Sequence, residues 1–264
     1  MNRIELHRIY VNCKIRCILL HKYGRQQAHL WIEVLMERFI NSFNKTFIVE
    51  GRYKLFITGI ENTIVIALFA TLIGIVIGIL VAIIRYSAKN SRKLFLFDII
   101  CNIYVSIIRG TPVVVQLLIM YYTIFSNIDN TIFIAVMTFG INSGAYVAEI
   151  ARAGIESVDS GQMEAGLSLG LNRSKAMFFI VLPQAVKNIL PALGNEFIAL
   201  LKETSVAGFI PVIDLTNAGN IIRSRTYEPF FSLYSVALCY LVMVLGLGAI
   251  QKRLERRFSQ GDRN

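Results

Sequence analysis

Long runs of residues without a charged side chain constrain this chain more than any other feature. Residues 62–84, 110–128, 131–148 and 229–250 contain no Asp, Glu, Lys or Arg. A helix rises 1.5 Å per residue, so about 20 apolar residues cross a hydrocarbon core of about 30 Å. Each run is therefore long enough, or just long enough, for one crossing. The pattern predicts an all-α membrane protein.

A fifth span is predicted where an apolar run contains charges. Residues 176–213 are apolar but include Lys187, Glu196, Lys202 and Glu203. Ionisable groups at membrane depth are costly and mostly face a cavity or a partner. We therefore expect this segment, fourth in order, to line a polar environment rather than lipid.

The stretch before the second uncharged run is less regular. Residues 94–108 are apolar but carry Asp98, and the Arg109-Gly-Thr-Pro sequence follows them. Proline breaks the helical hydrogen-bond ladder and disfavours helix at the residue before it. We predict an interfacial or entry helix over residues 94–108, and a second span that begins at Thr111 and Pro112.

Basic residues set the expected orientation. The net charge of +10 comes from short clusters between the apolar runs rather than from a nucleic-acid-binding patch. Clusters follow the first, third and fifth spans, whereas Arg223 and Arg225 before the fifth are a minority on the other side. Because basic loops stay in the cytoplasm, we predict a C-terminus in the cytoplasm and an N-terminus outside a bacterial cytoplasmic membrane.

The first 35 residues differ from the rest. They contain all three histidines and the only tryptophan, and Met36 opens an amphipathic lead-in over residues 36–58. We expect that translation starts at or near Met36, or that residues 1–35 form a disordered tail. A genuine basic tail on the membrane surface remains an alternative.

A hairpin with a small-residue face is predicted between the third and fourth spans. Asp159 is placed to cap a short helix, and Gly170 suits the left-handed position after it. Asn172 or Ser174 can cap the next helix. Ala165 and Gly166 leave almost no side chain, so another backbone can approach closely. The pattern indicates a docking element on the cytoplasmic side.

These residues resemble the EAA loop of ABC importer permeases. The matching positions are Glu164, Ala165, Gly166, Gly170, Ile180, Leu182 and Pro183, with Gly166 in place of an alanine. A second stretch, Arg109, Gly110, Thr111, Pro112 and Gln116, looks like a signature of polar amino-acid permeases. Residues 144–155 and 201–206 are similar to that subfamily too, and the likeness covers about residues 53–255.

The resemblance implies a type I permease fold of five spans with a cytoplasmic coupling helix, over residues 59–250, followed by a basic tail over residues 251–264. Two permease subunits, identical or related, would form the pathway, with two ATPase subunits beneath and an extracytoplasmic solute-binding protein above. Glu164 would contact the ATPase, Ala165, Gly166 and Gly170 would provide close approach and the turn, and Pro183 would set a bend.

The same resemblance implies that this chain is a transport subunit and not an enzyme. ATP and Mg would bind to the partner ATPase, and no cofactor or metal is expected in this chain, which lacks a phosphate-binding G-x-x-x-x-G-K-[ST] sequence. A permease for another small solute is the closest alternative. A secondary carrier or channel would share the spans but would not need the hairpin.

Two structural questions stay open at this level. Glu196, Lys202 and Glu203 are candidates for the substrate path, or they form a structural charge cluster. Gly74 and Gly78, four residues apart in the first span, suit either a seam between two permeases or packing within the chain.

Overall fold

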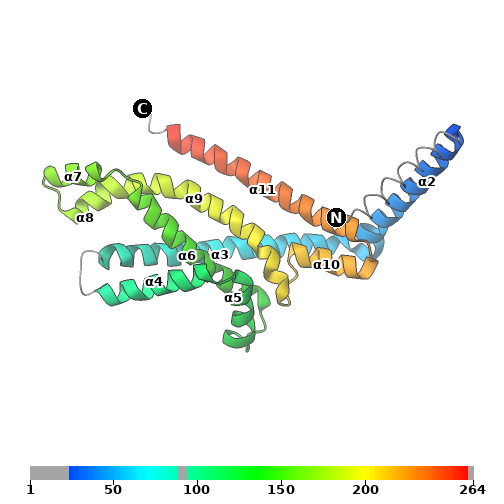
Figure 1. Ribbon diagram of the computed structural model, residues 1–264, viewed down its shortest axis with the longest axis horizontal. Coiled ribbons are helices and arrows are strands. Elements are labelled where there is room, and N and C mark those ends of the chain that lie inside the picture. The colour runs from blue at the N-terminus through cyan, green and yellow to red at the C-terminus, as the bar shows by residue number, and fades with distance from the viewer. Residues whose placement is uncertain (1–23, 89–93, 261–264) are drawn as a thin grey trace, which may run out of the picture.

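The computed structural model describes residues 24–88 and 94–260, and all regular structure in them is helical (Figure 1). Four segments of this part of the chain are long and apolar enough to cross a membrane: α3 (Tyr53–Ala88), α6 (Thr131–Glu156), the stretch Arg173–Phe209 and most of α11 (Pro229–Gln260). A bent helix pair between α3 and α6 brings the number of candidate spans to five. The predicted all-α, five-span architecture is confirmed.

Taken together as one candidate span, the bent helix pair is broken near Pro112, and the interfacial or entry role of residues 94–108 stays a prediction. Helix α4 (Phe95–Gly110) meets the pair α5 (Val113–Ile119) and η4 (Met120–Ile124) at an angle of 107°. Residues 113–124 alone extend only about 18 Å as a helix, too short to cross. On α4, Cys101 and Val105 are buried against α3 and α6. One face of α4 therefore packs on the bundle, while Phe95, Ile100 and Ile103 stay more than half exposed.

Helices α3 and α6 pack side by side at the centre. A Cβ atom on Gly74 would lie 2.8 Å from the Ser143 Cβ, and one on Gly78 would lie 2.5 Å from the Val147 Cβ. The two glycines thus let α6 approach within the same chain, as small residues do in membrane helix pairs. Of the two alternatives for this Gly-x-x-x-Gly pair, packing within the chain is the one observed.

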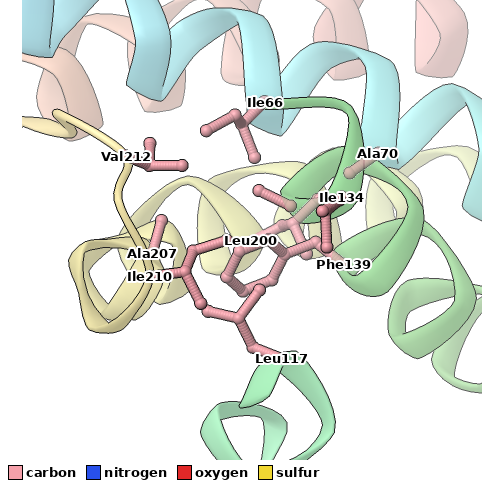
Figure 2. Packing of buried hydrophobic residues seen from close by; sticks show 10 residues of the cluster. Ile66, Ala70, Leu117, Ile134, Phe139, Leu200, Ala207, Ile210 and Val212 are labelled. Atoms are coloured by element: carbon pink, nitrogen blue, oxygen red, sulfur yellow. The ribbon is translucent and has the colours of Figure 1, made fainter. Parts of the chain in front are cut away.

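A hydrophobic core joins α3, α6, the end of α9 (Leu182–Glu203) and the broken span. Figure 2 shows Phe139 of α6 beside Ile66 of α3, Leu117 of α5 and Leu200 of α9, all fully or almost fully buried. Ile210 and Val212 of the following loop complete the cluster. This core holds the polar residues of α9 and α6 in fixed positions. By contrast, only 6% of the most apolar 18-residue stretch of α11 is buried inside the chain, so α11 lies on the outside of the bundle.

The bundle has two distinct ends (Figure 1). The hairpin end carries α7 (Ser160–Ser168), α8 (Arg173–Ala176) and η5 (Met177–Val181). The elbow end carries α2 (Gly24–Phe43), the turns η1 (Asn44–Ile48) and η2 (Val49–Gly51), and the start of α11. On the way to the elbow end, η6 (Thr204–Phe209) leads into α10 (Leu215–Thr226), whose N-cap Asp214 is fully buried.

The described part of the N-terminal region is helical. Helix α2 begins at Gly24 and runs through Met36 without a break. Residues 1–23 lie outside the described residues, and the position of the start stays a prediction.

Replacing Gly78 by Ala tests the close α3–α6 contact. The added methyl group would meet Val147 and the backbone nitrogen of Ala148 at 2.8 Å, so we expect overpacking to cost about 1–3 kcal/mol. Gly248→Ala on α11 is the matched control, because nothing lies within 4 Å of a Cβ there. In detergent, the melting temperature should fall for Gly78→Ala only. Equal melting temperatures for Gly78→Ala and the parent chain would contradict this packing.

Candidate functional site: the α7–α8 hairpin and the polar residues of the bundle

Local capping interactions build the hairpin α7–α8. The Asp159 carboxylate accepts a hydrogen bond from the Gly161 backbone N–H at 2.7 Å, and the Asn172 side chain accepts one from the Lys175 N–H at 2.9 Å. Asp159 is the predicted cap, and Asn172 rather than Ser174 caps α8. Free N–H groups at helix starts are satisfied in this way.

Gly170 ends α7 in the predicted left-handed conformation, with φ at +84°. The Gly170 N–H bonds to the Leu167 carbonyl, and the Leu171 N–H bonds to the Gly166 carbonyl, at 3.0 and 3.2 Å. This pair of bonds is the Schellman arrangement, in which glycine avoids the strain that a Cβ would cause. The chain therefore reverses sharply between α7 and α8.

The two motif halves contact each other across the hairpin. Gly166 is buried, and a Cβ there would lie 2.7 Å from the Ile180 Cδ1 and 3.0 Å from the Ala176 Cβ. Glu164 and Ala165 are exposed on the outer side of the hairpin. Small residues thus face inward, while a carboxylate is presented to whatever docks from outside the bundle.

The hairpin continues into α9 without a separate linker. Leu182 and Pro183 occupy the first turn of α9, directly after the π-helical turn η5. Pro183 thus lies inside a helical stretch that runs from Arg173 to Phe209, directly after the π-helical turn, and its role in setting a bend stays a prediction. The Gln184 amide also donates to the Gln162 side chain at 3.2 Å, which ties α7 to α9.

Gln116 forms hydrogen bonds that stabilise the corner at the Arg-Gly-Thr-Pro motif. Its amide donates to the Ile108 carbonyl at 2.8 Å and to the Thr111 hydroxyl at 2.8 Å, and its oxygen accepts from Asn142 at 3.0 Å. These bonds satisfy polar groups that the 107° bend exposes, groups that would be expensive to leave unpaired in an apolar medium. A Cβ atom on Gly110 would meet nothing within 4 Å, so this glycine is not required for close packing within the chain.

Arg109, at the end of α4, is held by neighbours on α6. Its guanidinium lies 5.3 Å from the centre of the Tyr146 ring and 4.0 Å from the Glu149 carboxylate. Both contacts are of kinds that anchor an arginine in place. Arg109 is thus an anchoring side chain of the broken span.

Of the three charged residues predicted for the substrate path, Glu196 has a defined partner. The Ser143 hydroxyl of α6 donates to the Glu196 carboxylate at 2.9 Å. Lys202 and Glu203 are exposed at the end of the same helix. Glu196 and Glu203 are one heptad apart, about 10 Å along α9, so they share a face.

An ion network lies between the bundle and the hairpin. Arg85 of α3 reaches Asp98 of α4 and Glu149 of α6, each at 3.8 Å. Arg152 pairs with Glu149 and also with Glu156 on the same helix. These residues line a cavity of about 460 Å³. The network links the ends of three helices next to α7.

Two neighbouring residues of this region were not predicted from the sequence. Asn142 bonds to Gln116 and Ser143 bonds to Glu196, although neither belongs to a quoted motif. Their signal was available, because two adjacent hydrogen-bonding side chains inside an uncharged span need partners within the protein. In the part of the chain that the structure describes, no group of three or more His, Cys, Asp or Glu is placed to hold a metal ion.

Comparison with known proteins gives consistent matches. The family described as "Binding-protein-dependent transport system inner membrane component" matches residues 74–260. The putative glutamine transport system permease protein GlnP of Rickettsia felis is 37% identical over 214 residues, covering 80% of this chain and 92% of the relative. The arginine transport system permease protein ArtQ of Bacillus subtilis is 36% identical, with coverage of 77% and 92%.

Solved structures agree with the fold. This chain is 40% identical to the protein in the structure described as "Crystal structure of an amino acid ABC transporter with histidines", with a TM-score of 0.72. The match covers 80% of this chain and 98% of that chain. An inward-facing MetNI methionine ABC transporter, 17% identical with a TM-score of 0.65, shares the fold alone. The type I importer permease fold predicted from the EAA loop is confirmed.

Gln116→Met tests the polar corner. Methionine keeps the length of the side chain but leaves the Ile108 carbonyl and the Asn142 amide without this partner. Each unsatisfied buried group costs about 1–3 kcal/mol, so we expect a lower melting temperature in detergent. Gln116→Glu keeps an acceptor for Asn142 but turns an anionic oxygen toward the Ile108 carbonyl, so its melting temperature should also fall below that of the parent chain. Unchanged stability of Gln116→Met would show that the corner does not depend on these bonds.

Proposed function

This chain belongs to the family of binding-protein-dependent transport system inner-membrane components, and we propose that it is the permease subunit of an ATP-driven importer of polar amino acids. It is a multi-pass inner-membrane protein. The substrate class is supported by relatives named for glutamine and arginine transport and by the 40% identity to an amino acid ABC transporter. The Arg109–Gln116 corner, which the polar amino-acid subfamily resemblance singles out, supports the same class.

The observation that carries the proposal is the hairpin α7–α8. It projects at one end of the bundle (Figure 1), exposes Glu164 and Ala165, and is fixed by two caps and a left-handed Gly170. A rigid hairpin of this kind moves as one unit, so a displacement of the hairpin is passed on to the helices that it joins. The ion network of Arg85, Glu149 and Arg152 joins α3 and α4 to α6, the helix that leads into the hairpin.

The exposed hairpin supports the following mechanism for coupling this chain to its ATPase. The hairpin docks in a surface cleft of an ATPase subunit, with Glu164 as the charged contact and the exposed Ala165 allowing close approach, whereas Gly166 allows close packing inside the hairpin. Closure of two ATPase subunits brings the two hairpins of a permease pair together. ATP and Mg belong to those partners, and this chain contributes the path and the mechanical link.

The orientation of the chain in the membrane is inferred from the basic clusters near the hairpin end. Arg85, Arg152 and Arg173 lie at the ends of α3 and α6 and in α8, so the positive-inside rule supports a cytoplasmic hairpin and C-terminus. The elbow end and the N-terminal part then face outward, where a solute-binding protein delivers the amino acid.

Glu196 and Ser143 are the best-supported members of a substrate path. A half-buried carboxylate in a span, held by a hydroxyl from the neighbouring span, is the kind of intramembrane polar site that marks a pathway. Glu203 and Lys202 extend the charged face toward the outer side. A zwitterionic substrate fits such an alternation of charges.

Glu164→Lys tests docking on the ATPase. A reversed interfacial charge typically costs several kcal/mol, a loss of more than about tenfold in affinity. We expect the co-expressed ATPase to be lost on purification of the variant. Asp129→Lys is the matched control, because Asp129 is an equally exposed carboxylate in the loop before α6. Retention of the ATPase by Glu164→Lys would contradict the proposed contact.

Glu196→Gln tests the path separately from assembly. Glutamine keeps an oxygen for the Ser143 hydroxyl but removes the charge. Uptake of the amino acid into proteoliposomes should fall severalfold, while ATPase recovery and melting temperature stay as in the parent chain. Ser143→Ala, which removes the hydrogen bond and leaves the charge, should have the smaller effect on uptake. Normal uptake by Glu196→Gln would assign Glu196 a structural role instead.

A further inference from the structure

Helix α2 carries an apolar stripe that stays largely exposed, although its Phe39 and Phe43 touch Phe231 of α11. Leu35, Met36, Phe39, Ile40 and Phe43 recur with helical spacing, and each is between 42% and 62% exposed. At 100° per residue they fall within an arc of about 140°. Between residues 33 and 43, the polar Glu33, Glu37, Arg38 and Asn41 lie outside this arc, as does the apolar Val34.

A structured elbow holds α2 at an angle to the spans. Glu50 and Gly51 both adopt left-handed conformations, with φ of 58° and 64°. The buried Arg52 side chain donates to the Lys45 carbonyl at 2.5 Å and pairs with Glu50 at 3.0 Å. The direction of α2 away from α3, visible in Figure 1, is therefore set by a built turn.

The stripe continues directly onto the lipid-facing surface of α11. The Phe39 and Phe43 rings lie 4.9 and 6.1 Å from the Phe231 ring, at the start of α11. There the side chains of Phe230 and Tyr234 are 55% and 66% exposed. Tyrosine is enriched at the boundary between hydrocarbon and water, so the exposed Tyr234 supports a position of this end of α11, and of the α2 packed on it, near the membrane surface.

We propose that α2 is an interfacial helix, whose stripe of Leu35, Met36, Phe39, Ile40 and Phe43 lies in the outer leaflet of the lipid bilayer. The polar arc, with Glu37 and Asn41, faces water. Its charges nearly balance, so binding depends on apolar burial rather than on anionic headgroups. The choice of leaflet depends on the proposed orientation, whereas the contact with lipid does not.

Other roles fit α2 less well. Its charged arc keeps it out of the hydrocarbon core, and it is absent from the described helices that are apolar enough to span. An amphipathic helix with a strongly polar face instead lies in the plane of the interface. Anchored there, α2 would fix the outer end of α3 and α11 while the hairpin end moves.

Spin labels on α2 in proteoliposomes test the proposal. Single cysteines at Met36, Ile40, Glu37 and Asn41 would be labelled in a full-length chain whose native cysteines are replaced by alanine. All four positions are exposed, so the labels should leave folding intact, which size-exclusion elution would verify. At each position, the collision rate of the spin label with oxygen, which concentrates in lipid, is compared with its collision rate with a water-soluble nickel chelate.

The ratio of oxygen to nickel collision should be severalfold higher at Met36 and Ile40 than at Glu37 and Asn41. Equal nickel access at all four positions would overturn the proposal by placing α2 in water. Shielding of Met36 and Ile40 from both reagents would overturn it in favour of a covering protein, such as a second copy of the chain.

Nickel chelate added only outside right-side-out vesicles tests the proposed orientation separately from the contact of α2 with lipid. Broadening of the Glu37 label by external nickel supports the outer leaflet. Broadening only by internal nickel would contradict the leaflet and the proposed orientation together, while the difference between the two faces of α2 would still establish its contact with lipid.

Discussion

The close contact between α3 and α6 is the constraint on which the rest of the bundle depends. Gly74 and Gly78 remove the side chains that would hold the two helices apart, so Ser143 and Val147 of α6 sit directly against the α3 backbone. Because lipid is as apolar as a leucine side chain, packing density rather than hydrophobicity drives such contacts. With α6 fixed at the centre, α4 packs on one side and α9 on the other.

Once α6 is central, its polar residues control the elements that surround it. Asn142 supports the corner of the broken span through Gln116, and Ser143 positions Glu196 on α9. Glu149 connects the same helix to Arg85 of α3, and Arg152 pairs with Glu149 and Glu156 within α6. Because α6 leads directly into the hairpin, a movement of the hairpin reaches the middle of the bundle along this helix, and α2 at the other end supplies a fixed point.

Local rules predicted the hairpin well, because its caps and its turn depend on nearby residues. Asp159, Asn172 and Gly170 adopt the predicted roles. The broken span was predicted only in part: proline indicated the break, but nothing local showed that α4 packs against α3 and α6. The contact of Ser143 with Glu196 joins residues 53 positions apart, and its pairing depends on the tertiary arrangement. The outer helix α2 crosses the expected boundary at Met36 because helical propensity continues there.

The most direct test of the coupling function is amino-acid uptake by the reconstituted complex. This chain would be purified with its ATPase, placed in sealed proteoliposomes and supplied with the cognate binding protein. We predict accumulation of a polar amino acid against its gradient only when ATP is present on the hairpin side and the loaded binding protein on the elbow side. Accumulation without ATP, or without the binding protein, would contradict an ATP-driven importer and would favour a secondary carrier or channel.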